Sequence, residues 1–399
     1  MAGMGIRALE LARALSREHE TRLLVPNAPR EAQDAAGDIA VVAAPPGRLA
    51  EAAAGASAAV VSGHAANSWF HEVPAVPVAV DLYDPFPIEN LHYARTLGEG
   101  TARHDLATLS LALSRGDFFL CASPEQRLFY AGALFAQGRI GASNFPDDPA
   151  LRDLLATLPF GVPESPAAGD RAAGRGAAGV AESGPLVLFG GIYDWYDPEL
   201  LLSAWPAVRE HAPEARLLFF ENPNPETTPQ GVFEAARARA KRIDPEGRSI
   251  RFSPWLPYSA RADLYAACDL AVSIASEGLE TELAYRTRLL DAAWGGLPSV
   301  AIAGGTLARE LAAAGAGLEC PRDADALAAA VSELLADAGK RERMGRAARA
   351  FAAQRSWATV AAPLLEWARR ARVDPGRGAL GSAPADSGAG GSLLSRIFR

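Results

Sequence analysis

Two arginines lie at a place in the chain where cations are usually disfavoured. Residues 270–274 form an apolar run that predicts a buried strand. Residues 280–298 follow it with a helical pattern that ends at the glycines and proline of residues 295–298. Arg286 and Arg288 fall in the first turns of this helix, where the positive end of the dipole disfavours each by some tenths of a kcal/mol. A phosphate or diphosphate bound at the helix N-terminus would offset that effect.

The alternative interpretation of these arginines is structural. Arg288 and Asp291 are three residues apart, a spacing that allows an ion pair within the helix, and Arg286 would then be solvated. The residues alone favour this ion pair slightly, so both interpretations stay open at this point.

The acids around the helix add a resemblance to a known family. Glu280 and Glu282 precede the arginines, and Asp291 stands just ahead of Trp-Gly-Gly-Leu-Pro. This order resembles the donor-binding motif of retaining GT-B glycosyltransferases of family four, in a divergent branch. There, one glutamate approaches the sugar and a second holds the ribose hydroxyls of a nucleotide-sugar. The resemblance implies that Asp291 binds ribose. It also implies that Glu280 or Glu282 contacts the sugar, because strict seven-residue spacing would land on Leu283.

The same resemblance assigns roles to the residues at the helix start. Arg286 or Arg288 would neutralise the leaving diphosphate, and Thr287 between them would belong to the donor site. Trp255 lies in a turn, residues 255–258, where the base edge of the nucleotide usually sits in that family.

Glycines at two further places predict close approach to a ligand. Gly190 and Gly191 end an apolar strand, which lets backbone N–H groups approach a ligand, although a tight turn under aromatic side chains is the alternative. In the family, such a segment lies beside the donor phosphates. Gly3 and Gly5 resemble the loop after a first strand, which lies over the donor phosphates or near the acceptor. A flexible terminus is the alternative for these two residues.

Two polar residues follow strands in the N-terminal half. His64 comes after the apolar residues 58–62, and Asp84 comes after residues 76–80. Because ligands bind at the carboxyl ends of parallel strands, we expect Asp84 on the acceptor side and His64 among the catalytic candidates. A lone histidine at a strand end is more often structural.

The composition bounds the class of protein. The chain has 399 residues and a formal net charge of −8, which argues against nonspecific nucleic-acid binding. Its three cysteines, Cys121, Cys268 and Cys320, are far apart, so neither a metal site nor a disulfide framework follows. The resemblance implies that no metal and no cofactor is needed. A reducing cytosol is the natural compartment, and we find neither a signal peptide nor an apolar run long enough to span a bilayer.

Strands and helices alternate through both halves, which predicts an α/β fold with two parallel sheets. The resemblance implies two Rossmann-like, doubly wound domains facing a cleft, the GT-B arrangement. We expect an acceptor-side domain at 1–163, a linker at 164–184 and a nucleotide-sugar domain at 185–355. A late helix at 356–373 would cross back to the first domain, and 374–399 would be a disordered tail. The first strand of a doubly wound sheet is missing, and we expect an apolar run encoded just before Met1.

The resemblance implies transfer of a sugar, with retention, from a nucleotide-sugar to a glycan or lipid-linked acceptor. The alternatives are a non-hydrolysing nucleotide-sugar epimerase, which would need His64 in the cleft, and a degenerate, non-catalytic binding subunit. Residues 392–399 are basic and amphipathic, so a weak contact with the inner membrane face is a further hypothesis. A frayed terminus is the favoured alternative for them.

Overall fold

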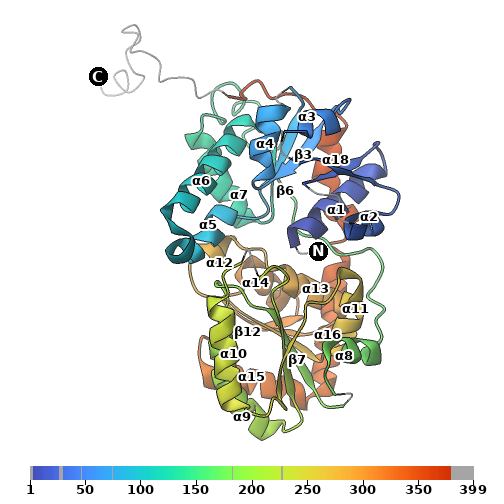
Figure 1. Ribbon diagram of the computed structural model, residues 1–399, viewed down its shortest axis with the longest axis vertical. Helices are drawn as coiled ribbons and strands as arrows, with labels where there is room; N and C mark the ends of the chain where they lie inside the picture. Colours follow the sequence, from blue (N-terminus) through green and yellow to red (C-terminus); the bar gives the residue numbers. More distant parts are fainter. Residues whose placement is uncertain are drawn as a thin grey trace, which may run out of the picture.

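The computed structural model describes residues 3–26, 30–45, 47–73, 75–181, 183–225 and 228–378. It shows two α/β domains stacked along the long axis of the molecule, with the start of α1 beside the seam between them (Figure 1). Every strand pairing within the named strands is parallel. The predicted fold class, α/β with two parallel-sheet domains, is confirmed.

The N-terminal domain alternates short strands with helices. Its strands are β1 (Arg22–Val25), β2 (Ala40–Ala43), β3 (Ala59–Ser62), β4 (Val78–Asp81), β5 (Phe118–Cys121) and β6 (Leu155–Thr157). Its helices are α1 (Gly3–Ser16), α2 (Arg30–Ala36), α3 (Leu49–Ala52), α4 (Ala65–Glu72), α5 (Phe86–Glu89), the 3-10 helix η1 (Asn90–Tyr93), α6 (Ala94–Arg115) and α7 (Pro124–Ala136).

The sheet of this domain is divided in two. β1 pairs only with β2, and β3 begins a second sheet in the order β3-β4-β5-β6. The inner strands β4 and β5 are buried at every residue, whereas most residues of β1 and β3 are partly exposed. No described strand lies between β1 and β3, where a doubly wound sheet would have its first strand.

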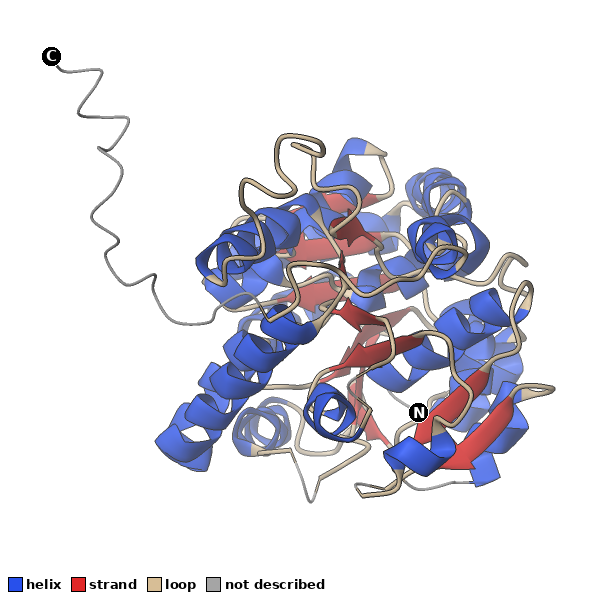
Figure 2. Cartoon of the chain, turned by 90° about the horizontal axis from the view of Figure 1, so that it is seen from above, coloured by secondary structure: helices blue, strands red, loops and turns tan. Residues whose placement is uncertain are grey.

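The C-terminal domain has one continuous sheet in the order β12-β11-β10-β7-β8-β9. Its strands are β7 (Leu186–Gly191), β8 (Arg216–Phe220), β9 (Ile250–Ser253), β10 (Leu270–Ile274), β11 (Ser299–Ile302) and β12 (Gly317–Glu319). Its helices are α9 (Pro198–His211), α10 (Gly231–Ile243), η2 (Tyr258–Ala260), α11 (Arg261–Ala267), α12 (Leu279–Leu283), α13 (Thr287–Gly295), α14 (Gly305–Ala313), α15 (Ala324–Ala336) and α16 (Ala338–Ala353). Helices cover both faces of the sheet (Figure 2).

The segment predicted as a linker contains a packed helix, α8 (Arg171–Ala178). Asp170 caps it by accepting hydrogen bonds from the N–H groups of Ala172 and Ala173. The helix lies against α11 so closely that a Cβ added to Gly174 would be 2.0 Å from the carbonyl oxygen of Asp263. The Gly/Ala-rich composition that indicated a linker is therefore what allows two helices to touch.

The chain returns to the N-terminal domain after α16. The short helices α17 (Trp357–Val360) and α18 (Ala362–Ala368) lie there, with the Trp357 ring 4.8 Å from that of Phe160 and the Trp367 ring stacked 5.8 Å from Phe118. The backbone of Trp357 also donates a hydrogen bond to Val162.

The first residues of the predicted disordered tail are ordered, which corrects that expectation for 374–378. Asp374 accepts a hydrogen bond from buried Arg139 at 3.0 Å, and Arg377 donates to Asp117 at 3.1 Å. Buried charges of the N-terminal domain thus find their partners in this segment. The rest of the tail, including the amphipathic residues 392–399, lies outside the described residues. In the described part of the chain, no helix is long and apolar enough to cross a membrane.

Candidate functional site

A cavity of about 500 Å³ lies between the two domains. The strand ends of the C-terminal sheet and helix α13 form one wall, and α1 and the segment after β4 form the other. In Figure 1, helices α12, α13 and α14 lie at the top of the C-terminal domain, facing the N-terminal one. Ten residues predicted for the site line the cavity: Gly3, Gly5, Asp84, Gly190, Gly191, Trp255, Arg286, Thr287, Arg288 and Asp291.

The segment predicted as one helix is two helices, α12 and α13, joined by three extended or turning residues. Ala284 has φ −73° and ψ 134°, and Arg286 has φ −69° and ψ 82°. Arg286 is therefore the N-cap of α13, and its side chain makes no cap hydrogen bond. The first N–H groups of α13 begin beside Thr287 and Arg288, which line the cavity, so this helix start is suited to an anion.

Arg286 is buried, with 4% of its surface exposed, and it pairs with Glu280. Its two Nη atoms donate to the Glu280 carboxylate at 2.8 and 2.6 Å, and one also donates to the Thr281 hydroxyl at 3.1 Å. Burial lowers the pKa of Arg286, but Tyr196 and Glu280 outweigh burial and hold it above its ordinary value. The buried Nε–H has no hydrogen-bond partner among the described residues. The prediction of a solvated Arg286 is wrong.

Arg288 holds the glycine turn. Its Nη atoms donate to the carbonyl oxygens of Phe189 at 3.0 Å and Gly191 at 2.8 Å, and its guanidinium lies 3.7 Å from the Tyr196 ring centroid. No carboxylate pairs with it in the described part of the chain, so the predicted ion pair with Asp291 is absent. Burial lowers the pKa of Arg288. A half-buried cation beside an uncapped helix start leaves this wall positively charged.

Gly190 and Gly191 form the turn beside Arg288. Gly190 has φ +88°, a left-handed conformation that favours glycine, and the pairing of β7 with β8 shifts register between Leu188 and Gly190. A Cβ on Gly191 would be 3.3 Å from the Trp255 ring. The turn thus brings backbone to the cavity wall and also packs under an aromatic side chain. Both interpretations of the sequence, close approach to a ligand and a tight turn under aromatic side chains, therefore apply.

Asp291 lies one turn into α13, and no described residue donates a hydrogen bond to its carboxylate. Burial raises its pKa to about 6, and only the charge of Arg261 opposes this. Arg261 itself stacks on Tyr258, 3.7 Å from that ring centroid. A carboxylate that faces a cavity without a partner is available to hydroxyl donors.

Gly3 and Gly5 are in the first turn of α1, not in a loop as predicted, although both line the cavity. Arg7 fixes this helix. Its guanidinium binds the Asp81 carboxylate at 2.6 and 2.9 Å and the carbonyl oxygens of Leu158 and Pro159. A buried ion pair therefore anchors the start of α1 against β4.

The sequence analysis missed Glu89, which lines the cavity beside Asp84. Pro85 starts the short helix α5 and Glu89 ends it, so the two carboxyl groups return to the same place and hydrogen-bond to each other. The spacing Asp-Pro-x-x-x-Glu is the signal that could have indicated the pair. Two aromatic residues of the wall, Tyr193 and Trp195, were also missed; their rings stack 5.0 Å apart.

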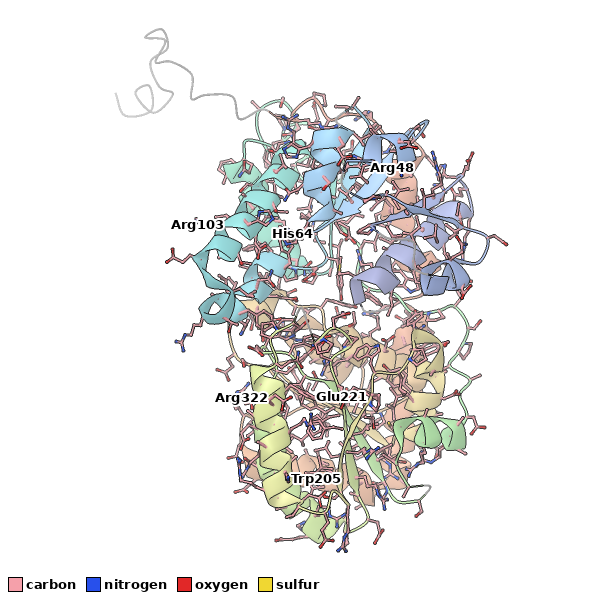
Figure 3. All side chains as sticks on the ribbon, in the orientation of Figure 1. Arg48, His64, Arg103, Trp205, Glu221 and Arg322 are labelled. Atoms are coloured by element: carbon pink, nitrogen blue, oxygen red, sulfur yellow. The ribbon has the colours of Figure 1, made fainter. Side chains whose placement is uncertain are left out.

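Three predicted catalytic residues do not line the cavity. Glu280 lies behind Arg286, and Glu282 has a side chain that is 63% exposed and 3.9 Å from Arg309. His64 is half-exposed in the N-terminal domain (Figure 3), where its Nε2 atom lies 3.1 Å from Asp105 and its ring stacks on His104. Direct contact of these side chains with a sugar in this cavity is not what the geometry supports.

No group of three or more histidine, cysteine, aspartate or glutamate side chains is arranged to hold a metal ion within the described ranges. All three cysteines are free, and burial raises the pKa of each thiol.

Residues 184–337 match the family model described as glycosyl transferases group 1. This range contains β7–β12 and the whole C-terminal wall of the cavity. Over these residues the chain is similar to that family. No curated protein matches the chain.

Solved structures similar to this chain show the same two-domain fold. Anabaena HepE in complex with UDP-glucose is 16% identical and has a TM-score of 0.67, covering 93% of this chain and 97% of its own. Sucrose-phosphate synthase from Thermosynechococcus elongatus is 16% identical with a TM-score of 0.64, covering 92% and 93%. WaaG, a glycosyltransferase involved in lipopolysaccharide biosynthesis, is 18% identical with a TM-score of 0.57, covering 91% and 95%. The GT-B arrangement predicted from the sequence is confirmed.

Proposed function

We propose that this protein transfers a sugar from a nucleotide-sugar to an acceptor hydroxyl. The observation that carries the proposal is the charge of the C-terminal wall. Arg288 has no carboxylate partner in the described structure, and it lies at the uncapped start of α13 and against the Gly190–Gly191 turn. Oriented N–H groups and an uncompensated cation are the features that bind and stabilise a diphosphate.

The same wall offers contacts for the diphosphate, the ribose and the base of the donor. The diphosphate would lie over Thr287 and Arg288, with the unpartnered Nε–H of Arg286 as a further donor. Asp291 would accept hydrogen bonds from the ribose hydroxyls, and Trp255 would pack against the base. Anabaena HepE, which shares this fold, forms a complex with UDP-glucose, and this supports a nucleotide-sugar here.

The roles of the first acids change with the geometry. Glu280 would act by holding Arg286 in place, because its carboxylate is fully used by that pair. Asp84, on the opposite wall, would face the acceptor. We infer that the acceptor is a glycan or lipid-linked glycan, that transfer retains the anomeric configuration, and that no metal is required; these parts rest on the sequence resemblance. We further infer that the protein is cytoplasmic and that it acts at the inner membrane face.

The first experiment is a thermal-shift and calorimetric screen of the full chain against UDP-, GDP-, dTDP- and ADP-sugars. We expect one nucleotide to bind and to release free sugar on incubation. Interconversion of the sugar without release would indicate the epimerase, and binding without turnover would indicate a non-catalytic subunit. The epimerase receives no support from His64, which lies away from the cavity lining. If no nucleotide-sugar binds, the proposal is wrong.

A further inference from the structure

We propose that Asp84 and Glu89 form a proton-sharing carboxyl pair that binds the acceptor hydroxyl and takes its proton during transfer. The inference rests on the proposed function and names the acceptor wall of the same cavity.

The pair is built by the chain immediately after β4. Asp84 follows the strand end at Asp81, Pro85 starts α5, and Glu89 ends it, so the two carboxyl groups meet and share a hydrogen bond. Both line the cavity between the domains. Two carboxyl groups in such contact do not both ionise easily, so the pair keeps one proton between them and the ionised carboxylate can accept a hydrogen bond from a hydroxyl.

Hydrogen bonds across the domain seam fix the pair relative to the donor wall. The side-chain amide of Gln126 donates to the carbonyl oxygens of Tyr83 at 2.9 Å and Leu283 at 2.8 Å. The Tyr83 hydroxyl donates to the carbonyl oxygen of Tyr285 at 3.0 Å. Residues next to Asp84 and residues next to Arg286 are therefore held in one register, which a reaction between two bound substrates requires.

The surroundings keep one proton on the pair. Burial raises the pKa of Asp84 to about 6; the hydrogen bond from Glu89 lowers it, and the charges of Asp81 and Glu280 raise it. Burial raises the pKa of Glu89 well above its ordinary value, as do the charges of Asp84 and Glu280, and Arg286 opposes them. The other titratable groups that face the pair are tyrosines: Tyr83, Tyr93, Tyr130 and Tyr193. The hydrogen bond between the two groups lowers the pKa of Asp84 and raises that of Glu89, so Glu89 keeps the proton when Asp84 ionises.

The chemistry balances without a further reactant. As the acceptor oxygen forms its bond to the anomeric carbon, its proton passes to the Asp84 carboxylate. The bond between the anomeric carbon and the phosphate oxygen breaks, and its electron pair leaves with the nucleoside diphosphate, which Arg288 faces. The protonated Glu89 donates a hydrogen bond to Asp84 and so orients it. A positioned base of this kind contributes about 10²–10⁴-fold to a rate.

The test compares pH–rate profiles of turnover for the wild type, Asp84→Asn and Glu89→Gln at saturating donor. The donor is the nucleotide-sugar identified by the binding screen, with water and octyl β-D-glucoside as acceptors. Glu99→Gln, on α6, is the matched control, because its carboxylate is 89% exposed.

We expect wild-type turnover to rise with pH through about 6, as Asp84 ionises, and to fall at higher pH, as Glu89 ionises. Asp84→Asn should lose about 100-fold or more at every pH, with donor affinity unchanged. Glu89→Gln can still donate to Asp84 but cannot ionise, so it should keep the rise and lose the fall. Glu99→Gln should match the wild type.

Each of the following outcomes would overturn the inference. Equal loss of donor affinity and turnover in Asp84→Asn would place the pair on the donor. An unchanged high-pH limb in Glu89→Gln would show that its proton is not used, and this variant carries the test alone if Asp84→Asn does not fold. Failure of the wild type to bind any nucleotide-sugar would overturn the proposed function and this inference together, whereas donor binding with an unchanged profile overturns only the inference.

Discussion

Arg286 and Glu280 form a buried ion pair, so a substitution at either residue affects both stability and catalysis. Arg286→Met leaves the Glu280 carboxylate buried without a cation, and we expect a loss of about 3–5 kcal/mol in the free energy of unfolding. The double variant Glu280→Leu/Arg286→Met removes both charges and should recover most of that stability. Urea denaturation of the two variants measures the difference.

The same double variant separates stability from catalysis. If Arg286 stabilises the leaving diphosphate, turnover should stay low while donor affinity falls less, even though the protein is stable again. Recovery of wild-type turnover in the double variant would show that Arg286 acts only through the ion pair.

Asp291 gives a prediction about pH. Its pKa is about 6 because the carboxyl is buried, and ribose hydroxyls bind the ionised form. Donor affinity should therefore strengthen as pH rises through about 6 and weaken below it. Asp291→Asn should bind the donor more weakly at neutral pH, by about 1.5–3 kcal/mol, and should show no such pH dependence. Calorimetric titrations at pH 5, 6, 7 and 8 test this. A pH dependence that survives in the variant would contradict the ribose assignment.

At this scale the sequence predicted which residues gather but not how they pair. Ten of the predicted site residues line one cavity. The pairing of Arg286 with Glu280 was not predictable from helical spacing, because the two residues belong to different elements, α12 and the N-cap of α13. Spacing rules apply within a helix, so the break between α12 and α13 hid the true partner of Arg286. Arg288 shares α13 with Asp291 but donates instead to the carbonyl oxygens of Phe189 and Gly191.

At the scale of elements, the position of α12 depends on the start of α14. Gly305 has φ +66°, and a Cβ there would lie 2.8 Å from the carbonyl oxygen of Thr281 in α12. Apolar periodicity continues through the residues between α12 and α13, although their backbone is not helical. The sequence therefore predicted a helix in this segment but not the break between α12 and α13. The helix within the predicted linker was missed for a similar reason, because it is stabilised by close glycine contacts with α11 and not by an apolar stripe.

Gly305→Ala and Gly247→Ala form a matched pair of variants. Both glycines have left-handed φ, +66° and +63°, but a Cβ on Gly247 meets no atom within 4 Å. We expect Gly247→Ala to cost about 1–2 kcal/mol from the backbone conformation. Gly305→Ala should cost about 1–3 kcal/mol more, from the clash with α12. Equal losses in urea denaturation would mean that α12 shifts without cost, and α12 would not be held by α14.

At the scale of the molecule, one apolar core joins the two domains. It includes Phe118 and Phe160 of the N-terminal domain, Leu289 and Ala301 of the C-terminal domain, and Trp357 from the returning segment. The two-domain layout and the return of residues 356–373 follow from alternating strands and a late amphipathic stretch. The continuity of the core could not be predicted from the sequence, because a hydrophobic pattern does not show which domain will pack against the apolar residues.

Trp357→Ala tests this shared core. The wild type should unfold in a single calorimetric transition, because the core couples the domains. The variant should lose about 3–5 kcal/mol and show two separate transitions. Leu106→Ala, at a side chain that is exposed on α6, should change neither the stability nor the number of transitions. Two transitions in the wild type would show that the domains unfold independently.

The central claim is that a nucleoside diphosphate binds at the start of α13, beside a cation that the protein itself does not neutralise. The most direct measurement is isothermal titration of the donor's nucleoside diphosphate into the wild type, Arg288→Met, Arg288→Lys and the control Arg103→Met, whose side chain is 76% exposed on the outer surface (Figure 3). We predict that Arg288→Met weakens binding by roughly 10- to 150-fold, the effect of a lost charged hydrogen bond. Arg288→Lys should retain part of the affinity, and Arg103→Met should bind as the wild type does. A folded Arg288→Met protein with wild-type affinity would contradict the account.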